Sequence, residues 1–252
     1  MFATRVFPFP PVPVVRPLMR SLFAASLAVA SLTSIASADL IFQAGTQTGS
    51  RYNPQANAAL PGGFTAANTI AFTNCLFEGG NTSVTLDSFT FGIRQLGGAP
   101  TVDIRIFIAE MDGAANLIAS SVQDLGLVTV GAAAASATTL VNFNAGGISL
   151  AMNDLAGTGN PGFSGFYVGI RFEGANATSN LNGWRINNAP ALGAAFNQFA
   201  AYDPTSLSLD YFAFTAPTPS YFYVDVNGSL VPAPGAVALL GLAGLTARRR
   251  RA

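Results

Sequence analysis

The 252-residue chain contains no histidine and a single cysteine, and all twelve of its basic residues are arginine. The absence of histidine excludes Ser-His-Asp and Cys-His catalysis and any His-ligated zinc site. The absence of lysine excludes a Schiff-base mechanism and the lysine of a P-loop. Cys75 alone can form neither an internal disulfide nor a thiolate metal cluster. These absences predict a protein without catalytic residues, and without a bound metal ion or other cofactor.

Charge is unevenly distributed along the chain, although twelve arginines and twelve acidic residues cancel to a net charge of zero. Seven arginines lie near the two ends, whereas all the acidic residues lie between Asp39 and Asp225. The central part therefore has five arginines against twelve acidic residues, a net charge of about −7. Such a surface has no basic stripe for nucleic acid and nothing that attracts anionic lipid, so neither is an expected partner.

The N-terminal residues have the pattern of a secretory signal peptide. Arg20 precedes an apolar run over residues 22–32, and small residues follow from Ala36 to Ala38. A basic start, an apolar stretch of about 11 residues and an A-x-A site predict cleavage between Ala38 and Asp39. The run is shorter than the ~20 residues of a membrane span, which disfavours the alternative of a membrane anchor.

Residues 1–18 fit this signal less well than the residues that follow. They are rich in proline and show no helical pattern, whereas Met19 begins a compact signal by itself. Met19 is therefore the expected translation start, with a long basic region from Met1 as the alternative. The predicted signal peptide is residues 1–38, or 19–38 if translation starts at Met19, and the export machinery is its partner.

The central part, residues 39–230, has the pattern of short β-strands. Hydrophobic and polar residues alternate with a period of two in three stretches, as in strands with one buried face. Turn residues separate the strands, and no stretch has a convincing helical period. The sequence thus predicts one all-β domain, an antiparallel, jelly-roll-like β-sandwich, in which residues 187–204 form a long loop. The clearest strands cover residues 102–109, 166–173 and 221–226, and weaker ones cover residues 40–43, 70–77, 84–94, 118–125, 140–144, 148–152, 183–186 and 207–214.

The C-terminal residues 231–252 combine three physical features. Pro232 and Pro234 end the last strand and stiffen a spacer. An apolar run over residues 236–247 follows, which as a helix is about 18 Å long against a hydrocarbon core of about 30 Å. Four arginines after it stop translocation and stay on the cytoplasmic side of a membrane. The pattern predicts a short apolar helix with transient membrane contact, and its shortness disfavours a permanent anchor.

This tail resembles the PEP-CTERM sorting domain of exported bacterial proteins, which has a Pro-Glu-Pro-type motif, a short apolar helix and an arginine-rich end. Ala233 stands where the named motif has glutamate. The resemblance implies processing by an exosortase-type membrane enzyme and a place on the cell surface or in the extracellular matrix. The central part resembles, more loosely, the β-rich ectodomains of such proteins, which mostly have no assigned activity. The sorting motif comprises Val231, Pro232, Ala233, Pro234, Gly235, Arg248, Arg249, Arg250 and Arg251.

Carboxylates are the remaining candidates for catalysis. Glu110 and Asp112 are two residues apart and would share one face of a strand, and a glycosidase needs two carboxylates about 5–10 Å apart. Asp112-Gly113 is also typical of a hairpin turn, which explains the same residues without catalysis. The alternative function is therefore a secreted hydrolase of glycans, with Glu110, Glu173 or a loop aspartate as the acid or base.

Calcium is a minority interpretation of two loops that are rich in Asn and Asp. Calcium binds six to eight oxygen ligands, and such loops can supply them. The spacing matches no EF-hand, and turn-forming Asx residues explain the same sequence. The residues concerned are Asn153, Asp154, Asn160, Asp203 and Asp210.

Aromatic residues are the candidates for contact with a ligand. Trp184, Tyr221 and Tyr223 are rings with a polar group, which suits a hydrated face that binds sugar rings. The alternative is that these rings complete the core, since strands commonly bury them. Together with the sorting signal, the sequence predicts a non-enzymatic structural or adhesive protein that contacts polysaccharide.

Overall fold

A computed structural model describes residues 39–56, 63–214 and 220–232 of the chain. The predicted signal peptide with Ala36 and Ala38, and the predicted sorting tail from residue 233 onwards, lie outside the described residues. Within the described ranges, no helix is long and apolar enough to cross a membrane. Asp39 is the first residue of a strand, and Val231 and Pro232 are the last two residues of another.

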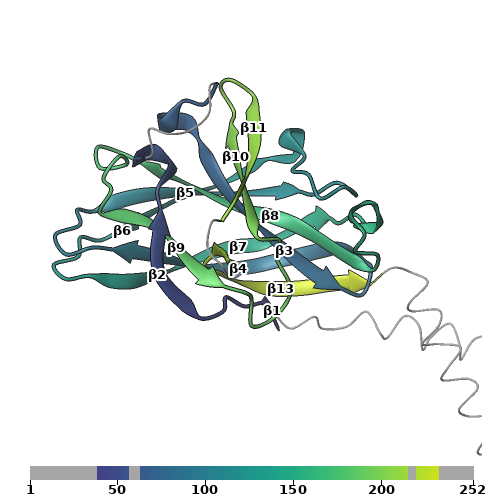
Figure 1. The fold of residues 1–252 in the computed structure, drawn as a ribbon. Coiled ribbons are helices and arrows are strands. Elements are labelled where there is room, and N and C mark those ends of the chain that lie inside the picture. Colours follow the sequence, from purple (N-terminus) through teal and green to yellow (C-terminus); the bar gives the residue numbers. More distant parts are fainter. Residues whose placement is uncertain (1–38, 57–62, 215–219, 233–252) are drawn as a thin grey trace, which may run out of the picture. The chain divides into compact units, whose positions relative to one another are not determined.

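Antiparallel strands form two sheets, and the helices of the described residues are single 3-10 turns. The strands are β1 (Asp39–Phe42), β2 (Gln47–Tyr52), β3 (Ile70–Glu78), β4 (Asn81–Gln95), β5 (Val102–Glu110), β6 (Gln123–Val130), β7 (Ala137–Ala151), β8 (Phe163–Glu173), β9 (Asn182–Asn188), β10 (Gln198–Asp203), β11 (Ser208–Ala213), β12 (Ser220–Phe222) and β13 (Val224–Pro232). A seven-stranded sheet has the order β1-β13-β4-β9-β12, with β2 beside β9 and β7 beside β4. A six-stranded sheet has the order β11-β10-β3-β8-β5-β6 (Figure 1). The predicted all-β antiparallel sandwich is thereby confirmed.

The main core lies between the two sheets. Inward side chains of β4, β5 and β8, such as Phe89, Ile104 and Phe172, are closed to solvent. Arg105 stays partly exposed between Ile104 and Ile106, so β5 alternates as its sequence predicts. Burial of this apolar surface stabilises the fold by roughly 25 cal/mol for each Å² removed from water.

A second apolar cluster covers the opposite face of the six-stranded sheet. Phe72 of β3 and Tyr167 of β8 pack there with Met111 from a connecting loop. The hydroxyl of Tyr167 donates a hydrogen bond to the carbonyl of Ala115 at 2.8 Å, which holds that loop over the sheet. Both faces of β3 are therefore covered, and every residue of this strand except Glu78 is buried.

The structure corrects the sequence prediction at several places. Residues 118–125, predicted to form a strand, contain a 3-10 turn at Ala119–Ser121, and β6 begins only at Gln123. The predicted strand 221–226 is interrupted at Tyr223, between β12 and β13.

Residues 187–204, predicted to form a loop, contain β10, which inserts between β3 and β11. Both faces of β10 are buried, so its sequence lacks the period-two pattern of a half-buried strand. Residues 140–144 and 148–151 belong to the single strand β7, because Gly146 and Gly147 adopt positive φ angles at an irregularity of the ladder instead of a turn between two strands.

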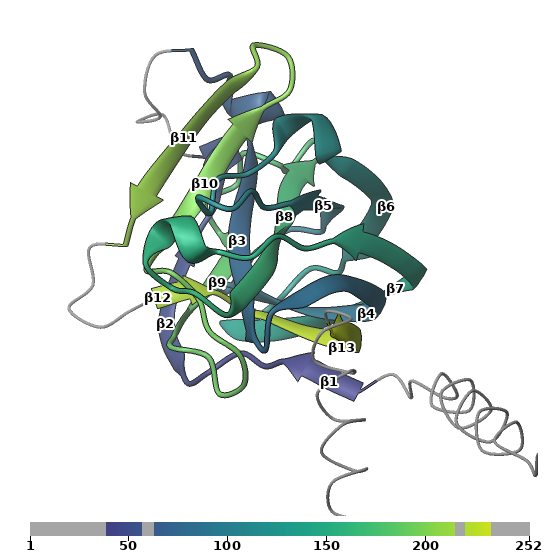
Figure 2. The same cartoon turned by 90° about the vertical axis from the view of Figure 1, so that its right-hand side faces the viewer.

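The first and last strands of the described body are neighbours. β1 pairs antiparallel with β13, with Asp39 opposite Gly228, as both views show (Figures 1 and 2). β13 continues past Gly228 to Pro232, about 13 Å further along the same direction. The Oδ1 atom of Asp225 accepts a hydrogen bond from the backbone N–H of Ala44 at 2.7 Å, which fixes the chain just after β1. The start of β1 and the end of β13 therefore lie at one end of the sandwich.

Candidate functional site: the outer face around Tyr223

Two of the three predicted ligand-binding rings belong to the core. Trp184 has no exposed surface, and its ring stacks on Phe222 with centroids 4.5 Å apart. Tyr221 is 1% exposed and packs edge-to-face against Phe42. Neither ring can offer a face to a sugar, contrary to the prediction from sequence. The cause is the packing between the sheets, where these strands bury their large apolar rings.

Tyr223 differs from the other two rings because it lies at the corner between β12 and β13. Its neighbours Phe222 and Val224 are fully buried, whereas Tyr223 is partly exposed. The backbone carbonyl of Tyr223 accepts hydrogen bonds from Gly92 N at 3.3 Å and from Trp184 Nε1 at 2.8 Å. Its ring lies over Gly92, where an added Cβ would be 2.6 Å from Tyr223 Cγ. Tyr223 thus lies against the outer face of the seven-stranded sheet.

The hydroxyl of Tyr223 is held by the carboxylate of Asp225, two residues further along the chain. It donates a hydrogen bond to Asp225 Oδ2 at 3.2 Å. Burial raises the pKa of Tyr223, and the charge of Asp225 raises it further. Burial also raises the pKa of Asp225, although the hydrogen bonds from Ala44 and Tyr223 oppose that shift. Asp225 is therefore occupied by contacts within the fold.

Replacing Gly92 by alanine is expected to lower the free energy of unfolding by about 1–3 kcal/mol, because the new methyl group overlaps the ring of Tyr223. Urea denaturation followed by circular dichroism measures the loss. The matched control is Gly131→Ala, since a Cβ at Gly131 meets no atom within 4 Å. Equal stability of the Gly92→Ala and Gly131→Ala proteins would contradict the close approach of the Tyr223 ring to the sheet.

Three of the five arginines of the central part gather beside Tyr223. Arg185 is opposite Arg51 in the pairing of β9 with β2, and Arg94 of β4 is opposite Gly183 of β9. Gly183 and Arg185 flank the inward-pointing Trp184, so both face outward. Arg94 and Arg185 are therefore diagonal neighbours on one face. We call the outer surface that carries Arg51, Arg94, Arg185 and Tyr223 the arginine face.

The arginines of this face have no acidic partner among the described residues. Arg185 is only 6% exposed, and its Nη1 donates a hydrogen bond to Thr138 Oγ1. The buried Nε atoms of Arg94 and Arg185 find no hydrogen-bond partner in the described part of the chain. Burial lowers the pKa of Arg185, and the nearby charge of Arg94 lowers it further. The face therefore concentrates positive charge that the fold does not neutralise.

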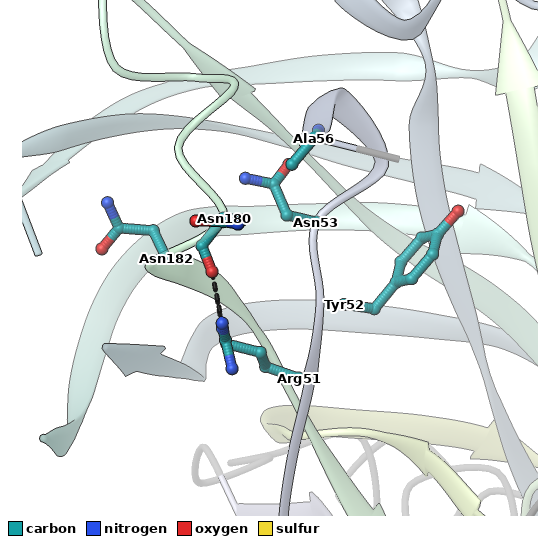
Figure 3. Close-up of a pocket in the computed structure, with 6 residues that line it drawn as sticks. All are labelled: Arg51, Tyr52, Asn53, Ala56, Asn180 and Asn182. Atoms are coloured by element: carbon teal, nitrogen blue, oxygen red, sulfur yellow. Dashed lines mark hydrogen bonds between the residues drawn. The ribbon is translucent and has the colours of Figure 1, made fainter. Parts of the chain in front are cut away.

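A shallow hollow of about 300 Å³ lies beside Arg51 at the edge of the arginine face. Figure 3 shows Arg51 and Asn53 pointing to the side of Asn180 and Asn182, while Tyr52 points the other way. The guanidinium of Arg51 donates two hydrogen bonds to the backbone carbonyl of Asn180, one of them from Nε at 3.0 Å. The hollow is thus lined by neutral amides and one cation, which are groups that hydrogen-bond hydroxyl-rich ligands.

The carboxylates of Glu110 and Asp112, considered for a hydrolase, are engaged in hydrogen bonds within the fold. Asp112 accepts hydrogen bonds from the backbone N–H groups of Ala114 and Asn116 at 2.9 and 2.7 Å, as the turn interpretation predicts. Glu110 Oε1 accepts a hydrogen bond from Ala151 N at 3.4 Å. Each of these two carboxylates is therefore used within a loop or between strands.

Glu173 lies in an ion-pair cluster on the outer face of the six-stranded sheet. Its Oε1 accepts hydrogen bonds from Arg105 Nε at 2.7 Å and from Arg171. Burial alone would raise the pKa of Glu173, but the two arginines outweigh it and hold that pKa below its usual value. Glu173 also lines a hollow of about 350 Å³, to which no second carboxylate of the described residues contributes. Glu173 is therefore a stably ionised partner of two arginines.

The oxygens considered for calcium serve the fold. Asp203 accepts hydrogen bonds from the backbone N–H groups of Thr65 and Thr205 at 2.7 and 2.8 Å. Asp154 accepts one from Gly162 at 3.3 Å. No group of three or more acidic or cysteine side chains in the described residues is arranged to hold a metal ion.

Comparisons with known proteins place the chain in no family. No protein-family model matches the sequence, and no curated protein matches it. Among solved structures, the cysteine protease and lectin-like domains of Cwp84, a surface layer associated protein of Clostridium difficile, are 14% identical with a TM-score of 0.39, over 64% of this chain and 32% of that chain. A chain in the structure of the Gt strain of infectious bursal disease virus is 14% identical to this chain, with a TM-score of 0.26, over 74% of this chain and 39% of that chain. This chain thus spans about a third of the length of the first of these proteins.

Proposed function

We propose that the protein is exported and acts on the cell surface or in the extracellular matrix, where its jelly-roll-like sandwich has a non-enzymatic structural or adhesive role. The signal peptide directs it to the export machinery. The PEP-CTERM-like tail then holds it in the membrane until an exosortase-type enzyme processes it. The outer face around Tyr223 contacts polysaccharide.

The observation that carries this proposal is the pairing of β1 with β13. The predicted cleavage site precedes Asp39, which begins β1, and the sorting motif begins with Val231 and Pro232, which end β13. The antiparallel pair brings both attachment points to one end of the sandwich. A domain held by the tail therefore projects its remaining surface away from the membrane, as adhesion requires.

The polysaccharide contact is supported by the chemistry of the outer face. The partly exposed ring of Tyr223 lies over Gly92 of the sheet, and sugars stack on tyrosine rings. Thr90 Oγ1 and Asn142 Oδ1 form a hydrogen-bonded pair on the same face, and Thr85 pairs with Ser149. Hydroxyl and amide groups of this kind form hydrogen bonds with neutral hydroxyl groups of a glycan.

Fractionation of the native cells, followed by the intact mass of the protein, tests the proposal. We expect a surface or extracellular form that begins at Asp39 and has lost Arg248 to Arg251. Replacing the four arginines by alanine is expected to stop processing and to change the distribution of the protein between membrane and exterior. Replacing Arg94 and Arg185 is the control, since these variants keep both signals. A full-length protein that stays in the inner membrane with its arginine tail intact would overturn the sorting proposal.

A further inference from the structure

We propose that the arginine face binds the acidic groups of a polysaccharide, with Arg94 and Arg185 holding a carboxylate or sulfate while the sugar ring packs on Tyr223. This inference rests on the proposed polysaccharide contact and specifies its chemistry. The ligand class is a glycan that carries uronate or sulfate groups.

The distribution of ion pairs is the first argument. The described residues contain five arginines, and Arg105 and Arg171 are paired with Asp124 and Glu173 on the six-stranded sheet. Arg94 and Arg185 lie together on the other sheet without a carboxylate, although acidic residues outnumber arginines in this part of the chain. Two neighbouring guanidinium groups without an anion destabilise a fold, which indicates a ligand that neutralises them.

The unpartnered atoms are the second argument. Arg185 is 94% buried, yet its Nε has no hydrogen-bond partner among the described residues, and the same holds for the buried Nε of Arg94. Buried polar groups are nearly always hydrogen-bonded, and an exception needs an explanation. Guanidinium groups present planar forks of N–H donors that match a carboxylate or sulfate. An oxyanion bound at the Nη groups of Arg94 and Arg185 supplies the negative charge that the fold does not place beside them.

The surroundings of the two arginines favour a sugar as the carrier of that anion. Tyr223 is a direct neighbour of Arg185, because its backbone N–H donates a hydrogen bond to the carbonyl of Arg185 at 2.8 Å. Asp225, the nearest carboxylate of that strand, is occupied by Ala44 N and by Tyr223, so it does not compete for the arginines. The hollow beside Arg51 adds the amide of Asn180 for further hydroxyl groups. The arginines match the acidic group of a sugar unit, the tyrosine ring matches its apolar face, and the amide matches hydroxyl groups of the neighbouring units.

The charge of the whole domain restricts the ligand to a sparsely charged polymer. Nucleic acids carry about one charge for each 1.7 Å of duplex, and their binding needs many basic contacts. The described body offers three unpaired arginines within a net charge of about −7, which repels a dense polyanion. A glycan with one acidic group per sugar places its charges further apart, so a single group can bind at the arginine face.

The test measures binding of the full-length protein by isothermal titration calorimetry. The probes are a short oligogalacturonate, a neutral galactose oligomer of equal length, inorganic sulfate and a single-stranded DNA oligomer. We expect the acidic oligomer to bind best, with an affinity that falls as salt rises. Arg94→Gln is expected to weaken this binding by about 10- to 100-fold, the usual effect of losing a charged hydrogen-bonding partner.

Matched variants separate binding from folding. Arg105→Gln removes the same charge from the opposite sheet and is expected to leave binding unchanged. Arg94→Lys keeps the charge but loses the planar fork, so it is expected to restore part of the affinity. Circular dichroism melting of each variant shows that it is folded, and addition of oligogalacturonate is expected to raise the melting temperature of the unmutated protein but not of Arg94→Gln.

Each other outcome overturns a distinct statement. Equal binding of the neutral oligomer, unaffected by Arg94→Gln, overturns the acidic ligand but leaves the polysaccharide contact standing. Binding of sulfate as tightly as the acidic oligomer overturns the role of the sugar, and tighter binding of DNA overturns the glycan class. If no oligomer binds, both this inference and the polysaccharide contact fail, while cell fractionation still decides the sorting proposal.

Discussion

Replacing Trp184 by alanine is expected to lower the free energy of unfolding by about 3–5 kcal/mol, the usual loss when a buried large ring is removed. Trp184 is closed to solvent between the sheets and stacks on Phe222 with an angle of 9° between the rings. Its Nε1 also donates the 2.8 Å hydrogen bond to the carbonyl of Tyr223, at the corner where β12 ends and β13 begins. The variant thus loses both core packing and one support of the arginine face.

Urea denaturation followed by circular dichroism measures this loss, because Trp184 is the only tryptophan and its fluorescence disappears in the variant. Trp184→Phe is the matched control. It keeps a ring in the stack and removes the hydrogen bond, so we expect a smaller loss of about 1–2 kcal/mol. A Trp184→Ala protein of native stability that has lost glycan binding would restore the role that the sequence predicted for this ring.

Replacing Asp203 by alanine is expected to lower the free energy of unfolding at pH 7 by about 2–4 kcal/mol. Asp203 ends β10, is closed to solvent and accepts hydrogen bonds from the backbone N–H groups of Thr65, Thr205 and Ser206. Removal of the carboxylate leaves these donors without their acceptor. It also removes one hydrogen-bonded link between the segment around Thr65 and the β10–β11 hairpin, and the link from Ser208 to Gly63 remains.

The contribution of Asp203 is expected to depend on pH. Burial alone would raise the pKa of Asp203, but the three backbone donors outweigh burial and hold that pKa below its usual value. A carboxylate whose pKa is lower in the folded state stabilises the fold above its unfolded pKa, about 3.9. This stabilisation disappears as the pH falls through the folded pKa. The difference in urea midpoint between the unmutated and Asp203→Ala proteins should therefore be large at neutral pH and small in strong acid.

Asp210→Asn is the matched control for this experiment. Asp210 is an exposed acid of the same hairpin, and its Oδ1 accepts a hydrogen bond only from the adjacent Tyr211 N. Its replacement removes the same charge without removing a link to another segment. A pH-independent loss in Asp203→Ala, or an equal loss in Asp210→Asn, would show that Asp203 does not act through its ionised contacts.

Two of the best-predicted strands differ in how they are covered: the first half of β5 has one partly exposed face, whereas β8 is buried on both faces over most of its length. β5 alternates between buried isoleucines and partly exposed side chains such as Arg105, and this contrast is visible in sequence. β10 is covered on both faces, so Phe199 to Tyr202 show no alternation and their strand was not predicted. The glycine pair 146–147 has the composition of a turn, but positive φ angles also fit a bulge within a strand. Composition alone does not distinguish these two conformations.

The candidate site was less accessible to sequence analysis than the strands. Trp184, Tyr221 and Tyr223 each combine a ring with a polar group, and only their packing shows that Tyr223, alone of these three, reaches the outer face. Arg51, Arg94 and Arg185 are far apart in sequence, and the pairing of β9 with β2 and β4 brings them together. The sequence offered one signal for this site. The central part has few arginines and many acidic residues, so an arginine that pairs with none of them is a candidate for binding a ligand.

The arginine face and the predicted tail attachment lie at opposite ends of one strand. Tyr223 immediately precedes β13, and Pro232 is its last residue. β13 is hydrogen-bonded to β4 on one side and to β1 on the other. A pull between a glycan bound at Tyr223 and a tether beyond Pro232 runs lengthwise along this strand, so its ladders are loaded in shear and their hydrogen bonds must yield together. If both proposed attachments form, an interior strand of the sheet carries the tension between them.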